Sequence, residues 1–122
     1  MNARVLPLLL LAIASACHCD KNEPEPTMVC GVVNPAENLP WLKKIIDDFK
    51  KDTSAMASYG YVQQSTYQGN TVFIVGTCLP WCELSCIRIV NCEGKDLDRL
   101  IVLDSPATLV WKAENSSCTF GQ

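Results

Sequence analysis

The sequence predicts a small α+β domain, in which one N-terminal amphipathic helix packs on a mainly antiparallel sheet of four or five short strands that is stapled by disulfides. Three observations carry this prediction. The chain has 122 residues, which is enough for one domain. It contains eight cysteines, a usage typical of oxidising compartments. One helical pattern precedes several strand patterns, whereas a parallel sheet would require helices and strands to alternate.

The helix is predicted over residues 39–51. Apolar side chains recur there at the i, i+3, i+4 and i+7 spacing of one helix face: Leu42, Ile45, Ile46 and Phe49. Pro40 suits the first helical turn, where a missing N–H costs nothing, and Asn38 is the expected N-cap. The adjacent Asp47 and Asp48 fall on the opposite, solvated face.

Beyond the helix the pattern changes to strands. The expected strands are residues 58–67, 71–77, 87–91, 100–103 and 107–113. Gln68-Gly69-Asn70 joins the first two as a β-hairpin. The first strand carries Tyr59, Tyr61 and Tyr67, which we expect to pack under the helix rather than to form a solvent-facing contact surface.

Residues 1–16 have the features of an export signal. Arg4 precedes an apolar run over residues 5–14, and Ala14-Ser15-Ala16 supplies the small residues that a signal peptidase requires. The apolar run is too short to cross a bilayer, which takes about 20 residues as a helix. We therefore expect residues 1–16 to be removed.

Cys17 follows this signal, and Ala14-Ser15-Ala16-Cys17 resembles a bacterial lipobox, although Ala14 stands where leucine is commonest. We expect Cys17 to carry a lipid that holds the protein to the outer membrane or the cell surface. Residues 17–29 are polar and proline-punctuated, as in a flexible tether, and residues 30–122 form the domain. The alternative is plain secretion, with Cys17 paired in a disulfide.

Six cysteines are expected to form three intramolecular disulfides: Cys30, Cys78, Cys82, Cys86, Cys92 and Cys118. The spacing leaves their connectivity open. One hint is that Cys78 ends a strand and Cys86 begins the next, so antiparallel pairing would bring the two together. Cys19 is the expected odd thiol. A zinc site, an iron–sulfur cluster and a thiol oxidoreductase each favour C-x2-C spacing, which is absent.

The chain lacks the usual residues of catalysis. Its one histidine, His18, lies in the tether, which excludes Ser-His-Asp and Cys-His arrangements within the domain. Asp96 and Asp98 flank a turn, where aspartates commonly bond the backbone, and their D-x-D spacing alone is a weak calcium signal. The chain has a net charge of −3 and lacks the basic stripe that nucleic-acid-binding proteins usually carry. We expect no enzyme, no cofactor and no metal.

A set of short motifs resembles a known family. The set comprises Leu39-Pro40-Trp41-Leu42, the hairpin residues 67–73, Cys78 with its Pro-and-Cys loop, Val90-Asn91-Cys92-Glu93-Gly94, and Val110-Trp111-Lys112. Together these are similar to small, uncharacterised lipoprotein domains of Bacteroidetes over residues 39–118. The resemblance implies a lipoprotein and an α+β order. It implies no activity, cofactor or catalytic residue.

Leu79-Pro80-Trp81, between Cys78 and Cys82, is the candidate binding loop, since tryptophan is a frequent interface anchor. We expect Trp81 to fold inward over the small core; exposure would instead favour binding. The first functional hypothesis is a non-catalytic, lipid-anchored envelope module with an unknown ligand. The second is a secreted, disulfide-rich inhibitor that presents this loop to a target protein.

Overall fold

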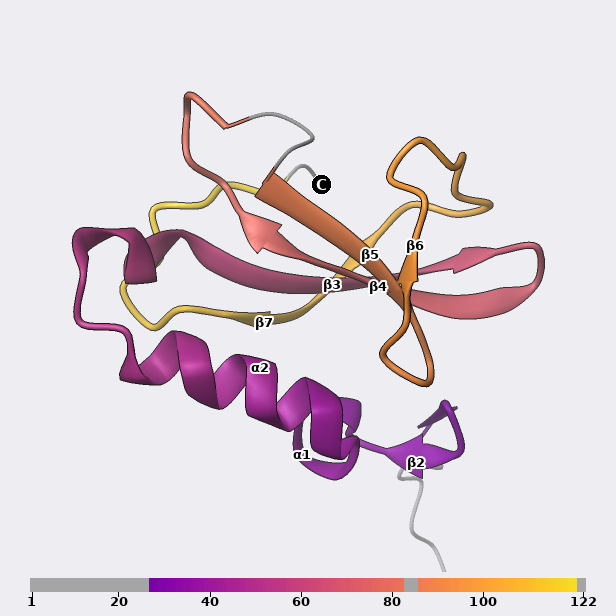
Figure 1. Cartoon of the computed structure of the whole chain (residues 1–122). Helices are drawn as coiled ribbons and strands as arrows, with labels where there is room; N and C mark the ends of the chain where they lie inside the picture. The colour runs from indigo at the N-terminus through magenta and orange to yellow at the C-terminus, as the bar shows by residue number, and fades with distance from the viewer. Residues whose placement is uncertain (1–26, 83–85, 121–122) are drawn as a thin grey trace, which may run out of the picture.

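The computed structural model describes residues 27–82 and 86–120 (Figure 1). Its elements, in chain order, are β1 (Met28–Val29), β2 (Val32–Val33), α1 (Pro35–Asn38), α2 (Pro40–Lys51), the 3-10 helix η1 (Ala55–Tyr59), β3 (Gly60–Tyr67), β4 (Asn70–Thr77), β5 (Ile87–Asn91), β6 (Asp96–Leu97) and β7 (Thr108–Lys112). Five strands form one antiparallel sheet in the order β6-β5-β4-β3-β7. The predicted α+β class is therefore confirmed.

Helix α2 lies along one face of this sheet (Figure 1). Its apolar stripe places Leu42 and Ile46 in the core, as the helical spacing predicts. The sheet side of this core consists of Val62, Phe73, Val75 and Val90. Lys50 and Lys51 occupy the last turn, where positive charge complements the helix dipole.

The start of α2 differs from the prediction. Leu39, not Asn38, is the N-cap residue, and no side chain caps the helix. Asn38 instead ends the short helix α1, and its side-chain amide donates a hydrogen bond to the Val33 carbonyl. Leu39 is buried, so core packing sets the entry into α2 in place of a polar cap. Strand β1 takes in Met28 and Val29, two residues that the sequence assigned to the tether.

The other face of the sheet is covered by the connection between β6 and β7. Residues 100–103, predicted as a strand, do not form one; the strand in this region is the shorter β6. The reason is that Ile101 and Leu103 turn inward and cover the sheet face itself, over a cluster of Val72, Ile74 and Ile89. The Asp104 amide donates to the Thr66 carbonyl at 2.8 Å and holds the connection against β3.

The tyrosines do not pack under the helix. Tyr61 and Tyr67 belong to the cluster on the face away from α2, because they alternate along β3 with the helix-facing Val62. Tyr61 meets Phe120 edge to face at 5.3 Å, and burial raises the pKa of its hydroxyl. Tyr59 lies before β3, in η1.

Three disulfides pair the six cysteines: Cys30–Cys92, Cys78–Cys118 and Cys82–Cys86. The hint that Cys78 pairs with Cys86 is therefore wrong. The tertiary structure explains why, since the segment after β7 runs back beside the start of β3. There the Ser117 amide donates to the Ser58 carbonyl, and the Cys78 amide donates to the Tyr59 carbonyl from the end of β4. Cys118 thus reaches Cys78.

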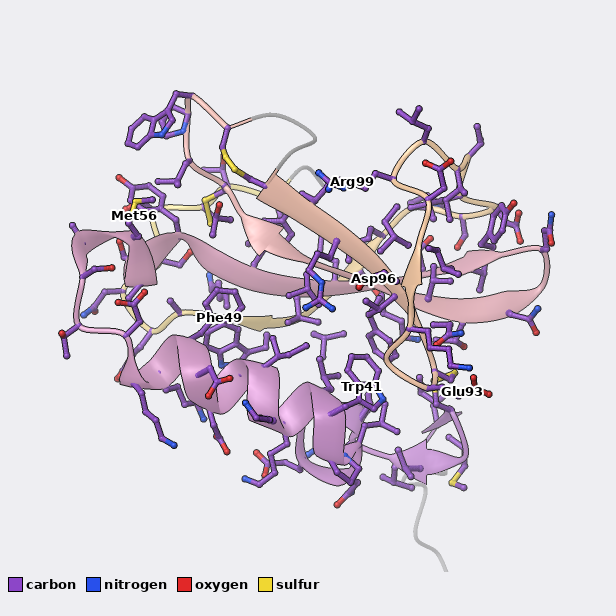
Figure 2. All side chains as sticks on the ribbon, in the orientation of Figure 1. Trp41, Phe49, Met56, Glu93, Asp96 and Arg99 are labelled. Atoms are coloured by element: carbon purple, nitrogen blue, oxygen red, sulfur yellow. A yellow bond between two sulfur atoms is a disulfide. The ribbon has the colours of Figure 1, made fainter. Side chains whose placement is uncertain are left out.

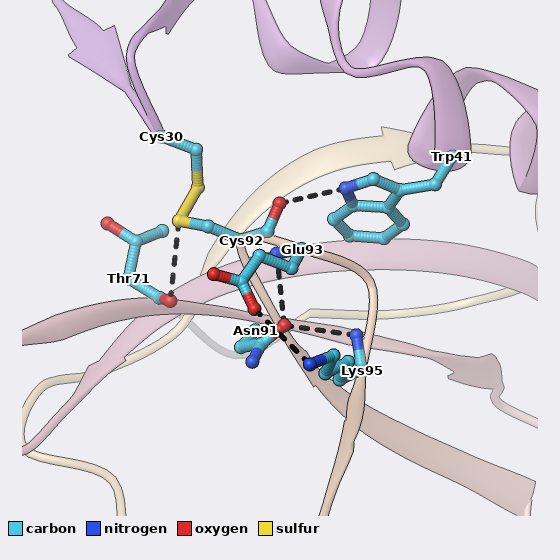
Figure 3. Close-up of a disulfide and its surroundings, with 7 residues drawn as sticks. All are labelled: Cys30, Trp41, Thr71, Asn91, Cys92, Glu93 and Lys95. Carbon is cyan, nitrogen blue, oxygen red and sulfur yellow. Dashed lines mark hydrogen bonds and ion pairs between the residues drawn. A yellow bond between two sulfur atoms is a disulfide. The ribbon is translucent and has the colours of Figure 1, made fainter.

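The Cys30–Cys92 disulfide joins the β1–β2 hairpin to the turn after β5 (Figure 3). The indole N–H of Trp41 donates to the Cys92 carbonyl at 2.9 Å from the other side. Within the turn, the Asn91 side-chain oxygen accepts the backbone amides of Glu93 and Lys95, each at 3.0 Å. The N-terminal hairpin and α2 are therefore both attached to this turn.

Candidate functional site

The candidate site is the turn that follows β4. Leu79 is 4% exposed and belongs to the interior, whereas Trp81 is 72% exposed and faces solvent. The expectation that Trp81 folds inward is therefore wrong, and Leu79 takes the inward place instead. Leu79 and Trp81 are separated by Pro80, and only Leu79 is buried.

A hydrogen bond closes this turn. The Cys82 amide donates to the Leu79 carbonyl at 2.9 Å, which is the bond of a four-residue β-turn. Pro80 occupies its second position, where the ring presets the backbone angle that the turn needs. Little conformational entropy is therefore left to lose when Trp81 contacts a partner.

Disulfides hold both ends of the turn. Cys78 is bonded to Cys118 across a Cα–Cα distance of 5.7 Å, which attaches the start of the turn to the C-terminal segment. Cys82 is bonded to Cys86, the residue directly before β5. In Figure 1 the segment after β4 lies at the opposite end of the molecule from the β1–β2 hairpin. The turn therefore projects away from the N-terminal end of the domain.

The carboxylates on α2 pair with lysines of the same helix. Lys44 donates to Asp48 at 2.9 Å, and this hydrogen bond lowers the pKa of the Asp48 carboxyl. Lys43 lies 3.7 Å from Asp47. These are pairs between neighbouring helical turns at the surface, in keeping with the solvated face that the sequence predicts.

Asp96 and Asp98 have separate roles. Arg88 contacts both Asp96 oxygens, at 2.8 and 3.3 Å, and this bonding lowers the pKa of the Asp96 carboxyl (labelled in Figure 2). Asp98 accepts the Leu100 amide at 2.9 Å, the local backbone role expected of a turn aspartate. Within residues 27–82 and 86–120, no group of three or more side chains is placed to hold a metal ion.

Several predicted features lie outside the described residues: the signal at residues 1–16, Cys17, His18 and Cys19. Among the residues that are described, no helix is long and apolar enough to cross a bilayer. No protein-family model, curated protein or solved structure matches this chain.

Sequence reasoning missed one exposed apolar pair. Leu100 and Val102 are 75% and 83% exposed on the connection between β6 and β7. A signal was present, since four consecutive apolar residues in an extended segment cannot all face one side. Their inward neighbours cover the sheet, so these two are directed to solvent.

Proposed function

We propose that this protein is an exported, lipid-anchored binding module without catalytic activity, and that it contacts a protein partner through Trp81. The observation that carries the proposal is the 72% exposure of Trp81 on a turn held by proline and two disulfides. A domain with a small core gains by burying a tryptophan. Leaving one outside on a rigid turn is the arrangement of an interface anchor.

The exposed area of the Trp81 side chain is large enough for a binding hot spot. A tryptophan buries roughly 150–250 Å², so a side chain that is 72% exposed has about 110–180 Å² left for a partner to cover. At about 25 cal/mol per Å², that contact is worth roughly 3–4.5 kcal/mol. The turn is already ordered in the free protein, so little of this binding free energy is lost in ordering the turn.

A photoreactive benzophenone amino acid tests the contact in the cells that produce the protein. Placed at Trp81 it should cross-link to one partner, whereas the same group at Val102, which is at least as exposed, should not. Trp81→Ala should weaken binding of that partner at least about 30-fold, a loss of ~2 kcal/mol. Its unfolding free energy should stay within about 0.5 kcal/mol of wild type. No adduct at position 81, or equal adducts at both positions, would refute the proposed contact.

The anchor is tested separately. Cys17→Ser, or globomycin treatment, should leave the protein unprocessed or release it from the membrane fraction. A stable anchor needs more than one acyl chain, which a diacylated and N-acylated Cys17 would supply. If the untreated wild-type protein is found in the soluble or medium fraction, the lipid anchor is excluded.

The second candidate is a secreted inhibitor that uses the same turn, and the exposure of Trp81 favours it as well. The two functions differ in where the protein is found and in what its partner loses. An inhibitor should be soluble in the medium and should abolish its target's activity at equimolar ratio. A membrane-bound protein whose cross-linked partner keeps its activity excludes the inhibitor.

A further inference from the structure

A cleft of about 540 Å³ opens where the end of α2, the helix η1 and the end of β7 meet. No residue of the Trp81 turn lines it. Its volume falls within the roughly 300–1,000 Å³ of ordinary small-ligand sites. The cleft is thus a second candidate site, built by other elements.

An aromatic pair forms part of the lining. Phe49 points from α2 toward the sheet (Figure 2) and stacks on Trp111 of β7, with ring centroids 5.6 Å apart and an interplanar angle of 21°. The Trp111 indole N–H has no hydrogen-bond partner among the described residues. Every buried side-chain nitrogen or oxygen atom of those residues has a partner. This N–H therefore reaches solvent. The pair offers an apolar surface beside a donor that is available to a ligand.

The polar lining is balanced in charge. Lys50 and Lys112 are matched by Asp52 and Glu114. A backbone amide in the following turn donates to Asp52 at 2.8 Å and lowers the pKa of its carboxyl, which keeps it ionised. Asn115 adds a side-chain amide, which both donates and accepts. Two cations and two carboxylates give neither an anion nor a cation a net advantage.

We propose that this cleft binds a neutral saccharide. The C–H face of a sugar ring packs on aromatic surface, and its hydroxyls donate and accept hydrogen bonds at once. Trp111, Asn115 and the mixed charged groups supply both kinds of partner. A charged ligand would leave like-charged groups of the lining opposed to it, and an apolar ligand would leave the polar groups without partners. The inference concerns a site separate from the proposed Trp81 contact.

The indole N–H signals of the full domain provide the test, because Trp41, Trp81 and Trp111 each give one. Glucose, galactose, N-acetylglucosamine and their β-1,4-linked disaccharides are titrated to about 20 mM, enough to load a millimolar site. At least one should shift the Trp111 signal and the Asn115 side-chain amide to saturation. Trp41 and Trp81 should stay unchanged. Absence of any saturable shift, or a shift of Trp81 instead, would overturn the proposal.

Variants locate the site further. Asn115→Ala should raise the Kd of the responding sugar about three- to tenfold, the effect of one hydrogen bond. The matched control Asn70→Ala removes an exposed asparagine at the start of β4, outside the cleft, and should leave the Kd unchanged. Glucose 6-phosphate and glucuronate should bind no better than glucose. Tighter binding of either acid, or equal effects of the two asparagine variants, would refute a neutral saccharide site.

Discussion

Replacing Gly94 with alanine tests how the N-terminal half is attached to the sheet. Gly94 has a φ of +80° in the turn after β5, and a Cβ built there would lie 2.9 Å from the Trp41 ring. That ring donates its N–H to the Cys92 carbonyl at 2.9 Å and meets Phe73 edge to face at 5.6 Å. The added methyl group should therefore strain the backbone and displace Trp41.

The expected cost is the sum of three effects. Placing an L-residue in the left-handed backbone conformation lowers the free energy of unfolding by about 1 kcal/mol. Displacing Trp41 loses one hydrogen bond, worth about 1 kcal/mol, and one aromatic contact, worth roughly 0.5–1.5 kcal/mol. Gly94→Ala should therefore lower the free energy of unfolding by about 3 kcal/mol.

Gly69→Ala is the matched control. Gly69 also has a positive φ, +76°, but a Cβ there would meet nothing within 4 Å. Only the backbone cost of about 1 kcal/mol should remain. Urea denaturation of the oxidised proteins, followed by far-UV circular dichroism, measures both values. If the two variants are destabilised equally, the contact between Gly94 and Trp41 does not hold the fold as argued.

Three further outcomes follow from the same structure. Denatured, unreduced protein should show at most one or two free thiols, and four or more would mean that the disulfides are absent. Replacing both Cys30 and Cys92, which are 62 residues apart, should lower the free energy of unfolding by about 4 kcal/mol. Replacing Cys82 and Cys86, which are four residues apart, should lower it by about 2 kcal/mol, because closing the shorter loop removes less entropy from the unfolded chain. Equal losses would refute this ranking. Arg88→Gln should raise the Asp96 pKa toward its ordinary value in a carboxyl NMR titration. The lowered pKa of Asp96 adds stability above about pH 4, and this stability is lost on acidification. As the pH falls, the free energy of unfolding should therefore decrease less in the variant than in the wild type.

Local patterns were sufficient for α2 and for the β3–β4 hairpin. The apolar spacing of residues 39–51 predicts α2, and the β-branched runs around Gln68-Gly69-Asn70 predict the β3–β4 hairpin, because each depends on neighbours close in sequence. Asn38 shows the limit of such reasoning. Its type suits an N-cap, yet the burial of Leu39 decided where α2 begins.

Long-range contacts decided the rest. Composition predicts that the cysteines pair, but Cys78 meets Cys118, 40 residues away, because the segment after β7 returns beside β3. The pairing of β7 with β3 places Trp111 against Phe49, and this pair lines the cleft. Trp81 faces solvent whereas Leu79, two residues earlier, is buried, a difference that no sequence pattern records. Residue types thus determined α2, the β3–β4 hairpin and the presence of crosslinks, whereas packing in three dimensions determined the disulfide pairing and which side chains are left exposed.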